Sequence, residues 1–181
     1  MAEADLIKLY SGRILELAAD IPRTGALDAP QARVTRRSPL CGSNITVDVC
    51  VADGRITDFA QDVRACALGQ AAASVLGANV IGRTRPEIAQ ARDALAAMLT
   101  EDGPAPAAPF DALEVLIPAR SFQNRHKSIL LALEATAEAM AQAERAACAY
   151  AAATRSISTR APTAKPVTPM QVRAGSWSAE K

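Results

Sequence analysis

The sequence predicts an α+β domain: a small antiparallel β-sheet with helices packed on one face and a long C-terminal helix. Apolar and polar residues alternate through 45–52 and again through 55–59, which is typical of strands. Much of the remaining chain has apolar residues at helical spacing. The predicted strands follow one another before the later helices begin. This order favours helices gathered on one face of an antiparallel sheet.

The two alternating runs predict a β-hairpin. The first run is separated from the second by Asp53-Gly54. Asp-Gly is typical of hairpin turns because both residues tolerate a positive φ. Residues 33–38, which lie ahead of Pro39, predict a further short strand.

Five segments have the apolar spacing of helices, and proline or glycine marks several of their ends. They are 4–19, 66–77, 86–99, 110–117, and a long helix that starts at 124 or 125 and continues past 147. Pro86 suits the first turn of its helix, where the missing N–H would have no partner. Turn-rich 24–30 and Pro/Ala-rich 103–109 predict loops between these elements.

The 181 residues predict one domain over 1–150, followed by a disordered tail over 151–181. From Arg155 onward the chain consists mainly of Ser, Thr, Pro, Ala and basic residues, with Trp177 among few large apolar side chains. Such a segment buries too little apolar area to offset the entropy of ordering it.

Bulk composition excludes some classes of function. The formal net charge is +1, which gives no reason to expect nucleic acid or a membrane surface as partner. No apolar run approaches the roughly 20 residues that a transmembrane helix requires. The acidic start, residues 1–5, lacks the basic and apolar stretches of a signal peptide. A reducing cytoplasm is therefore expected, where cysteines serve as ligands, reactive thiols or core residues.

Cys41 and Cys66 are candidate functional residues. Cys41 lies in the turn that leads into the first hairpin strand, and Cys66 lies where the second hairpin strand passes into a helix. Because the two strands are antiparallel, both thiols should meet at one end of the sheet. A helix start also presents positive potential, which favours a thiolate. For Cys50, in mid-strand, and Cys148, in an Ala-rich helix, we favour a structural role.

The single histidine, His126, stands at the start of the long helix. A lone histidine there is more often a surface or capping residue than a ligand, although imidazole binds zinc and iron well. Two cysteines and one histidine are one ligand short of a tetrahedral structural site. The residues alone leave a zinc site open.

Several motifs, in order, resemble the IscU/SufU/NifU N-terminal family of iron–sulfur scaffolds, and the resemblance covers roughly residues 4–140. The matching segments are 5–10 in the first helix, Ser38-Pro39-Leu40-Cys41-Gly42, the hairpin, 65–74 (similar to G-C-A-I-S-x-A-S-A-S), Gly82-Arg83-Thr84 (similar to G-K-S/T), and 126–132 (similar to H-C-S-I-L-A). The long interval between Cys66 and His126 is closer to SufU than to IscU. The resemblance implies a SufE/NifU-like fold.

The chain departs from the family at two ligand positions. The family uses three cysteines and an aspartate two residues after the first. Here Ser43 stands at the aspartate position, and the motif places Lys127 at the third cysteine. A serine hydroxyl is a poor ligand and a lysine ammonium has no lone pair. The L-P-P-V-K segment of IscU is also missing, since 121–125 reads S-F-Q-N-R.

The resemblance implies a non-enzymatic scaffold or carrier. Cys41, Cys66 and His126 would hold a transient cluster, with 2Fe–2S the expected type, or iron; zinc is the alternative metal. A second subunit, a partner or a small thiol would complete the coordination, so a homodimer is possible. Cysteine desulfurase and cluster-recipient or carrier proteins are the implied partners.

Two alternatives stay open. The chain could accept persulfide sulfur from a cysteine desulfurase, or it could be a degenerate paralogue that keeps the fold for protein–protein interaction. In the second case Lys127 would occupy the old metal cavity and pair with a carboxylate or with a thiolate of Cys41 or Cys66.

Overall fold

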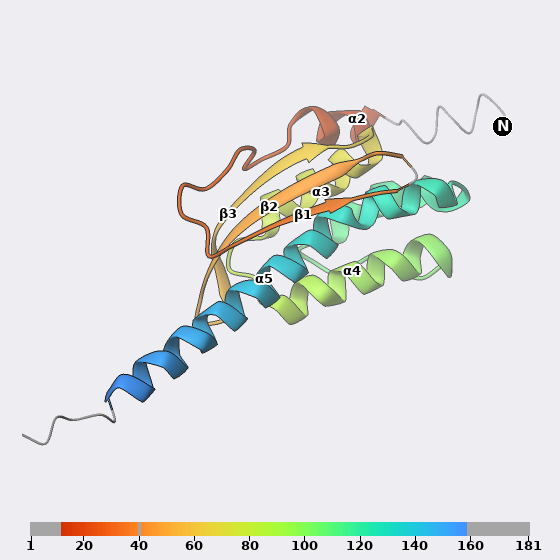
Figure 1. Ribbon diagram of the computed structural model, residues 1–181. Coiled ribbons are helices and arrows are strands. Elements are labelled where there is room, and N and C mark those ends of the chain that lie inside the picture. Colours follow the sequence, from red (N-terminus) through yellow and green to blue (C-terminus); the bar gives the residue numbers. More distant parts are fainter. Residues whose placement is uncertain (1–11, 40, 159–181) are drawn as a thin grey trace, which may run out of the picture.

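The computed structural model describes residues 12–39 and 41–158, with side chains described up to residue 147. In chain order the elements are α2 (Gly12–Ala19), β1 (Ala32–Arg37), β2 (Asn44–Ala52), β3 (Arg55–Arg64), α3 (Ala67–Asn79), α4 (Arg85–Thr100), the 3-10 helix η1 (Asp111–Ser121) and α5 (Gln123–Ser158). Figure 1 shows the three strands side by side, with α3 and α5 against the sheet and α4 beside α5. The predicted α+β fold is confirmed.

The sheet is antiparallel throughout, with the strand order β1-β2-β3. The predicted hairpin joins β2 to β3, and both of its turn residues have positive φ, 51° for Asp53 and 73° for Gly54. β3 continues five residues beyond the predicted end at 59. The reason is Gln61, a fully buried polar residue opposite Val47 on the core side, whose amide donates to the carbonyls of Pro22 and Ala73. A polar residue at an inward position interrupts the alternation on which the prediction relied.

The core lies between one face of the sheet and the helices. Ile45, Val47 and Val49 of β2 are fully buried, as are Ile129 and Leu133 of α5 to within 1%. α5 contacts β1 and β2, α3 packs beside α5, and α4 packs on α5 from the other side. Since aromatic residues make up only 3% of the chain, this core is built from small and branched aliphatic side chains.

The helices largely match the predicted segments. α2 begins at Gly12, and residues 4–11 of the predicted first helix lie outside the described residues. η1 continues past the predicted stop at Pro118 as far as Ser121. None of the described helices combines the length and the apolar character needed to cross a bilayer.

α5 starts at Gln123, one residue before the predicted start, and runs to Ser158. The first eight residues of the predicted tail, 151–158, are therefore helical, which fits the high helix propensity of the alanines that precede them. Residues 159–181 lie outside the described part, so disorder of that segment stays a prediction.

Gly77 of α3 tests how tightly this core is packed. A Cβ at Gly77 would lie 2.5 Å from Gln61 Nε2 and 2.9 Å from the Pro22 carbonyl oxygen, whereas a Cβ at Gly12 would meet nothing within 4 Å. Gly77→Ala should therefore lower the free energy of unfolding by about 1–3 kcal/mol relative to Gly12→Ala. Urea denaturation of the two variants measures this difference. Equal denaturation midpoints for the two variants would show that α3 is not tightly packed at Gly77.

Candidate functional site

The structure places Cys41 and Cys66 at the same end of the sheet. Cys41 lies in the loop 38–43 between β1 and β2, and Cys66 is the N-cap residue of α3, two residues after β3 ends. The two chain segments are brought together because Asn44, the first residue of β2, pairs with Arg64, the last residue of β3. Both thiols are half-buried and unbridged.

The loop that carries Cys41 is closed by its own backbone. The Ser38 amide donates to the Ser43 carbonyl at 2.8 Å, and the Gly42 amide donates to the Ser38 carbonyl at 3.2 Å. Gly42 has φ +70°, a conformation that other residues rarely adopt. The glycine after the first cysteine is thus required by the turn, and the turn sets Cys41 and Ser43 side by side.

Two serine hydroxyls connect the two thiols. Cys41 Sγ lies 3.1 Å from Ser43 Oγ, the Ser128 hydroxyl donates to Ser43 Oγ at 3.0 Å, and Ser128 Oγ lies 3.5 Å from Cys66 Sγ. Ser43 is 4% exposed and Ser128 is fully buried. These four residues form one hydrogen-bonded group, which we call the thiol–serine cluster.

Gly69 sets the position of Ser128. A Cβ at Gly69 would lie 2.7 Å from Ser128 Oγ and 3.0 Å from the Ser128 carbonyl oxygen. Only glycine therefore lets the first turn of α3 approach the second turn of α5 so closely. This approach brings a residue from far along the chain to the two cysteines.

The position that faces the thiols on α5 is Ser128, and not Lys127 as the motif alignment predicted. Lys127 is exposed, whereas Ser128 is buried in the cluster. Successive helical residues point about 100° apart, so a shift of one position exchanges an inward for an outward side chain. The helical periodicity of the sequence could have predicted that Ser128 points inward, because it lies on the same helix face as residues 131, 132, 135 and 139, all of which are buried.

The structure does not bring His126 to the two thiols. His126 precedes Ser128 by two residues, about 200° around the helix. Its side chain is 7% exposed, and Nε2 lies 3.0 Å from the Ala119 carbonyl oxygen, beside Arg120 of η1. Across the described ranges, no three His, Cys, Asp or Glu side chains gather closely enough to hold a metal ion. The donors present at the thiol–serine cluster do not fit a four-ligand zinc site.

The cluster favours the thiolate form of Cys41. Partial burial raises the pKa of Cys41, but the polar surroundings formed by nearby serine hydroxyls, of which that of Ser43 lies 3.1 Å from Sγ, and by the Ser43 backbone outweigh it and lower the pKa from 9.0 to about 7. Near neutral pH about half of Cys41 is then ionised. A thiolate is the form that binds metal or attacks sulfur.

The other two cysteines take no part in this cluster as far as the structure describes them. Cys50 is the seventh of the nine residues of β2, and its Sγ lies 3.7 Å from the Ala29 carbonyl oxygen. Cys148 lies in α5 where side chains are not described, so its predicted structural role stays a prediction.

Comparisons with known proteins agree with these features. Residues 9–114 match the family described as the NifU-like N terminal domain. The structure of a nitrogen-fixing NifU-like protein (N-terminal) from Brucella abortus is 45% identical, covers 78% of this chain and 98% of its own, and superposes with a TM-score of 0.76. A search of curated proteins gave no match.

A second structure shares the fold at lower identity. It is a proposed iron–sulfur cluster assembly scaffold protein for the SUF system from thermophilic Fervidobacterium islandicum AW-1, 18% identical, with a TM-score of 0.65 over 74% of this chain and 98% of its own. The fold and the paired cysteines define a domain of the NifU N-terminal type. The chain belongs to the NifU N-terminal family, as its motifs predict.

The ionisation of Cys41 can be measured by its reactivity. The rate of alkylation at Cys41 should rise with pH through a midpoint about 7, because only the thiolate reacts. Ser43→Ala removes a hydrogen-bond donor and should move this midpoint upward, toward 9.0. Peptide mass spectrometry separates the sites, and the alkylation of Cys50 should be the same in both proteins. An unchanged Cys41 midpoint in Ser43→Ala would contradict the assigned role of the hydroxyl.

Proposed function

We propose that this protein is a scaffold or carrier in iron–sulfur cluster assembly that holds nascent cluster or iron through Cys41 and Cys66. The observation that carries the proposal is the pair of half-buried thiols joined in one hydrogen-bonded cluster, in a chain of this family. The 45% identity to a NifU-like protein supports it. The chain acts here as a carrier and catalyses no reaction of its own.

The donor set favours transient binding. One chain offers two thiolates, whereas iron–sulfur clusters are usually held by four protein ligands. Neutral serine hydroxyls are weak competitors for iron. The missing ligands must come from a second copy of the chain, from a partner protein or from a small thiol, and a cargo held by two thiolates is readily passed on. A cysteine desulfurase would supply sulfur, and a recipient or carrier protein would take the finished cluster.

Anaerobic reconstitution tests this proposal. The intact protein, incubated with ferrous iron and sulfide, should give the visible absorption of a cluster. Cys41→Ser and Cys66→Ser should each lose most of this absorption, because a single cysteine of the thiol–serine cluster then remains in each chain. Cys50→Ser, which removes a thiol outside the cluster, is the matched control and should retain the absorption. A colourless product from the intact protein would overturn the proposal.

A second function, sulfur acceptance, is favoured by the chemistry of Cys41. A thiol with pKa about 7 is substantially ionised at neutral pH and still a good nucleophile. The Cys41 thiolate would attack the outer sulfur of a desulfurase persulfide. The S–S bond of that persulfide breaks, the desulfurase cysteine leaves as a thiolate, and a persulfide forms on Cys41 without net oxidation.

Incubation with a purified cysteine desulfurase and cysteine tests sulfur acceptance. Intact-mass and peptide analysis should find one added sulfur atom on Cys41, and the yield should fall severalfold in Ser43→Ala at pH 7, where less thiolate is present. Cys50→Ser should behave like the intact protein. If neither a persulfide nor a cluster forms, the remaining alternative is a protein-interaction module that uses the fold alone.

A further inference from the structure

Ser38 carries an unpaired hydroxyl next to the thiol–serine cluster. It is 1% exposed, and its Oγ has no hydrogen-bond partner. Two other buried side-chain atoms in the described part of the chain lack a partner, Gln61 Oε1 and Arg83 Nε, but each of those side chains bonds through another of its atoms. Among the described residues, Ser38 is thus the one whose only polar side-chain group is both buried and unpaired. Such a group destabilises a fold, so its presence needs a reason.

The strand and the loop place this hydroxyl beside Cys41. Alternation along β1 turns Ser38 to the buried side of the sheet, the side of Val34. The Ser38 amide donates to the Ser43 carbonyl, which folds the loop 38–43 back toward Ser38. The hydroxyl is therefore near Cys41 Sγ and contributes to the low pKa of that thiol, although it makes no hydrogen bond to it. A sulfur atom attached to Sγ lies about 2 Å farther out, where it can meet a hydroxyl that Sγ does not reach.

The other hydroxyls of the cluster have no proton left to donate. Ser128 donates its single hydroxyl proton to Ser43 Oγ. Ser43 directs its own proton to Cys41 Sγ, 3.1 Å away, because a thiolate can only accept. Ser128 Oγ then accepts from the Cys66 thiol, whose Sγ lies 3.5 Å away. The proton of the Ser38 hydroxyl is the one that remains for a further acceptor.

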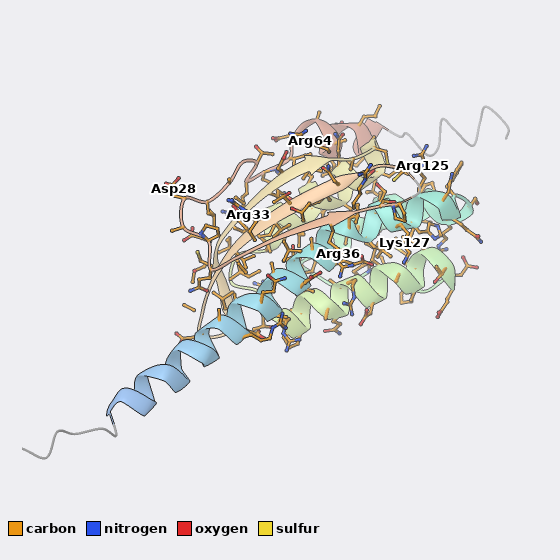
Figure 2. All side chains as sticks on the ribbon, in the orientation of Figure 1. Asp28, Arg33, Arg36, Arg64, Arg125 and Lys127 are labelled. Carbon is orange, nitrogen blue, oxygen red and sulfur yellow. The ribbon has the colours of Figure 1, made fainter. Side chains whose placement is uncertain are left out.

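No basic side chain takes this role in the described part of the site. None is among the groups that set the pKa of Cys41. Arg36, two residues before Ser38, is bound to Glu138 of α5 at 2.8 Å, and Figure 2 shows it beside that helix. Arg37 precedes Ser38 directly, so strand alternation turns it to the opposite face of the sheet. Negative charge on a group added to Cys41 must therefore be stabilised by hydrogen bonds.

We propose that the Ser38 hydroxyl binds the outer sulfur of a persulfide on Cys41. The inference rests on the sulfur acceptance proposed above and names the residue that receives the transferred atom. When the Cys41 thiolate takes a sulfur atom from a donor, the negative charge moves to that outer sulfur, beyond Sγ and the Ser43 hydroxyl bonded to it. A hydrogen bond from Ser38 stabilises the charge, and hydrogen bonds to charged acceptors are the stronger kind.

The same hydrogen bond explains why a buried, unpaired hydroxyl is present. In the unmodified protein Ser38 Oγ makes no hydrogen bond, so its removal breaks none. In the persulfide form the hydroxyl is paired. Ser38 should therefore affect the stability of the persulfide and not that of the fold, and this difference separates a sulfur-binding role from a structural one.

Sulfur exchange between the full chain and glutathione persulfide tests the proposal. The Cys41 thiolate attacks the outer sulfur of glutathione persulfide, the S–S bond of the donor breaks, glutathione leaves as a thiolate, and a persulfide anion forms on Cys41 with no net oxidation. At about pH 10, above the ordinary thiol pKa of 9.0, Cys41 is ionised in every variant. Alkylation followed by peptide mass spectrometry gives the equilibrium ratio of persulfide to thiolate at each cysteine.

Ser38→Ala should lower the persulfide-to-thiolate ratio at Cys41 about tenfold, because a hydrogen bond to a charged sulfur is lost. The matched control is Ser74→Ala, which removes a buried hydroxyl outside the cluster that donates to the Asp20 carbonyl at 2.9 Å. It should change the Cys41 ratio less than about twofold. Urea denaturation should give the opposite order, with Ser74→Ala destabilised and Ser38→Ala unfolding no earlier than the intact protein. The ratio at Cys50 should be the same in all three proteins.

An unchanged Cys41 ratio in Ser38→Ala would overturn the proposal, and so would an equal fall at Cys41 and Cys50. A loss of stability in Ser38→Ala as large as that in Ser74→Ala would also overturn it, because the hydroxyl would then be paired in the unmodified protein. The exchange needs neither a desulfurase nor iron. A failed desulfurase reaction or cluster reconstitution would therefore leave the Ser38 result standing, and an unchanged ratio in Ser38→Ala would leave both proposed functions standing.

Discussion

The close contact of α3 and α5 at Gly69 is the constraint on which the functional end of the molecule depends. It presses the Ser128 hydroxyl between Cys66 and Ser43, and Ser43 in turn contacts Cys41. Three chain segments that are far apart in sequence, a hairpin loop, a helix start and a second helix start, are joined by this one approach. A larger side chain at Gly69 would separate α3 from α5 and disperse the cluster.

The chemical consequence is a thiol site in which the hydroxyls of Ser43 and Ser128 are the groups in contact with Cys41 and Cys66. Hydroxyl groups donate hydrogen bonds to a thiolate without carrying charge, so Cys41 ionises near neutral pH although the described site contains no cation in contact with it. The same hydroxyls bind iron weakly. The site thus favours a reactive thiolate over tight binding of a metal ion.

The ion pairs along the sides of the molecule differ from those at its thiol end. Along the sides of the molecule, arginines such as Arg36 and Arg85 bind glutamates of α5 and fasten the sheet and α4 to that helix. At the thiol end the basic side chains remain directed to solvent, with one long ion pair among the described residues.

The sequence by itself determined the hairpin, the order of the elements, the family and the meeting of Cys41 and Cys66, because period-two alternation, an Asp-Gly turn and antiparallel direction are local properties. It could not place Ser128, since the residue that faces the thiols follows the motif's third-cysteine position by one residue, and only the packing of α3 on α5 decides which side of α5 faces them. The family resemblance assigned His126 to the site, whereas the tertiary structure places its Nε2 against the Ala119 carbonyl. The sequence also did not predict the full length of β3, because Gln61 interrupts the alternation of apolar and polar residues. The buried amide of Gln61 donates to the carbonyls of Pro22 and Ala73, which are distant in sequence. Local sequence patterns reflect the conformational preferences and burial of neighbouring residues. Buried polar contacts between distant segments form only when tertiary packing brings those segments together.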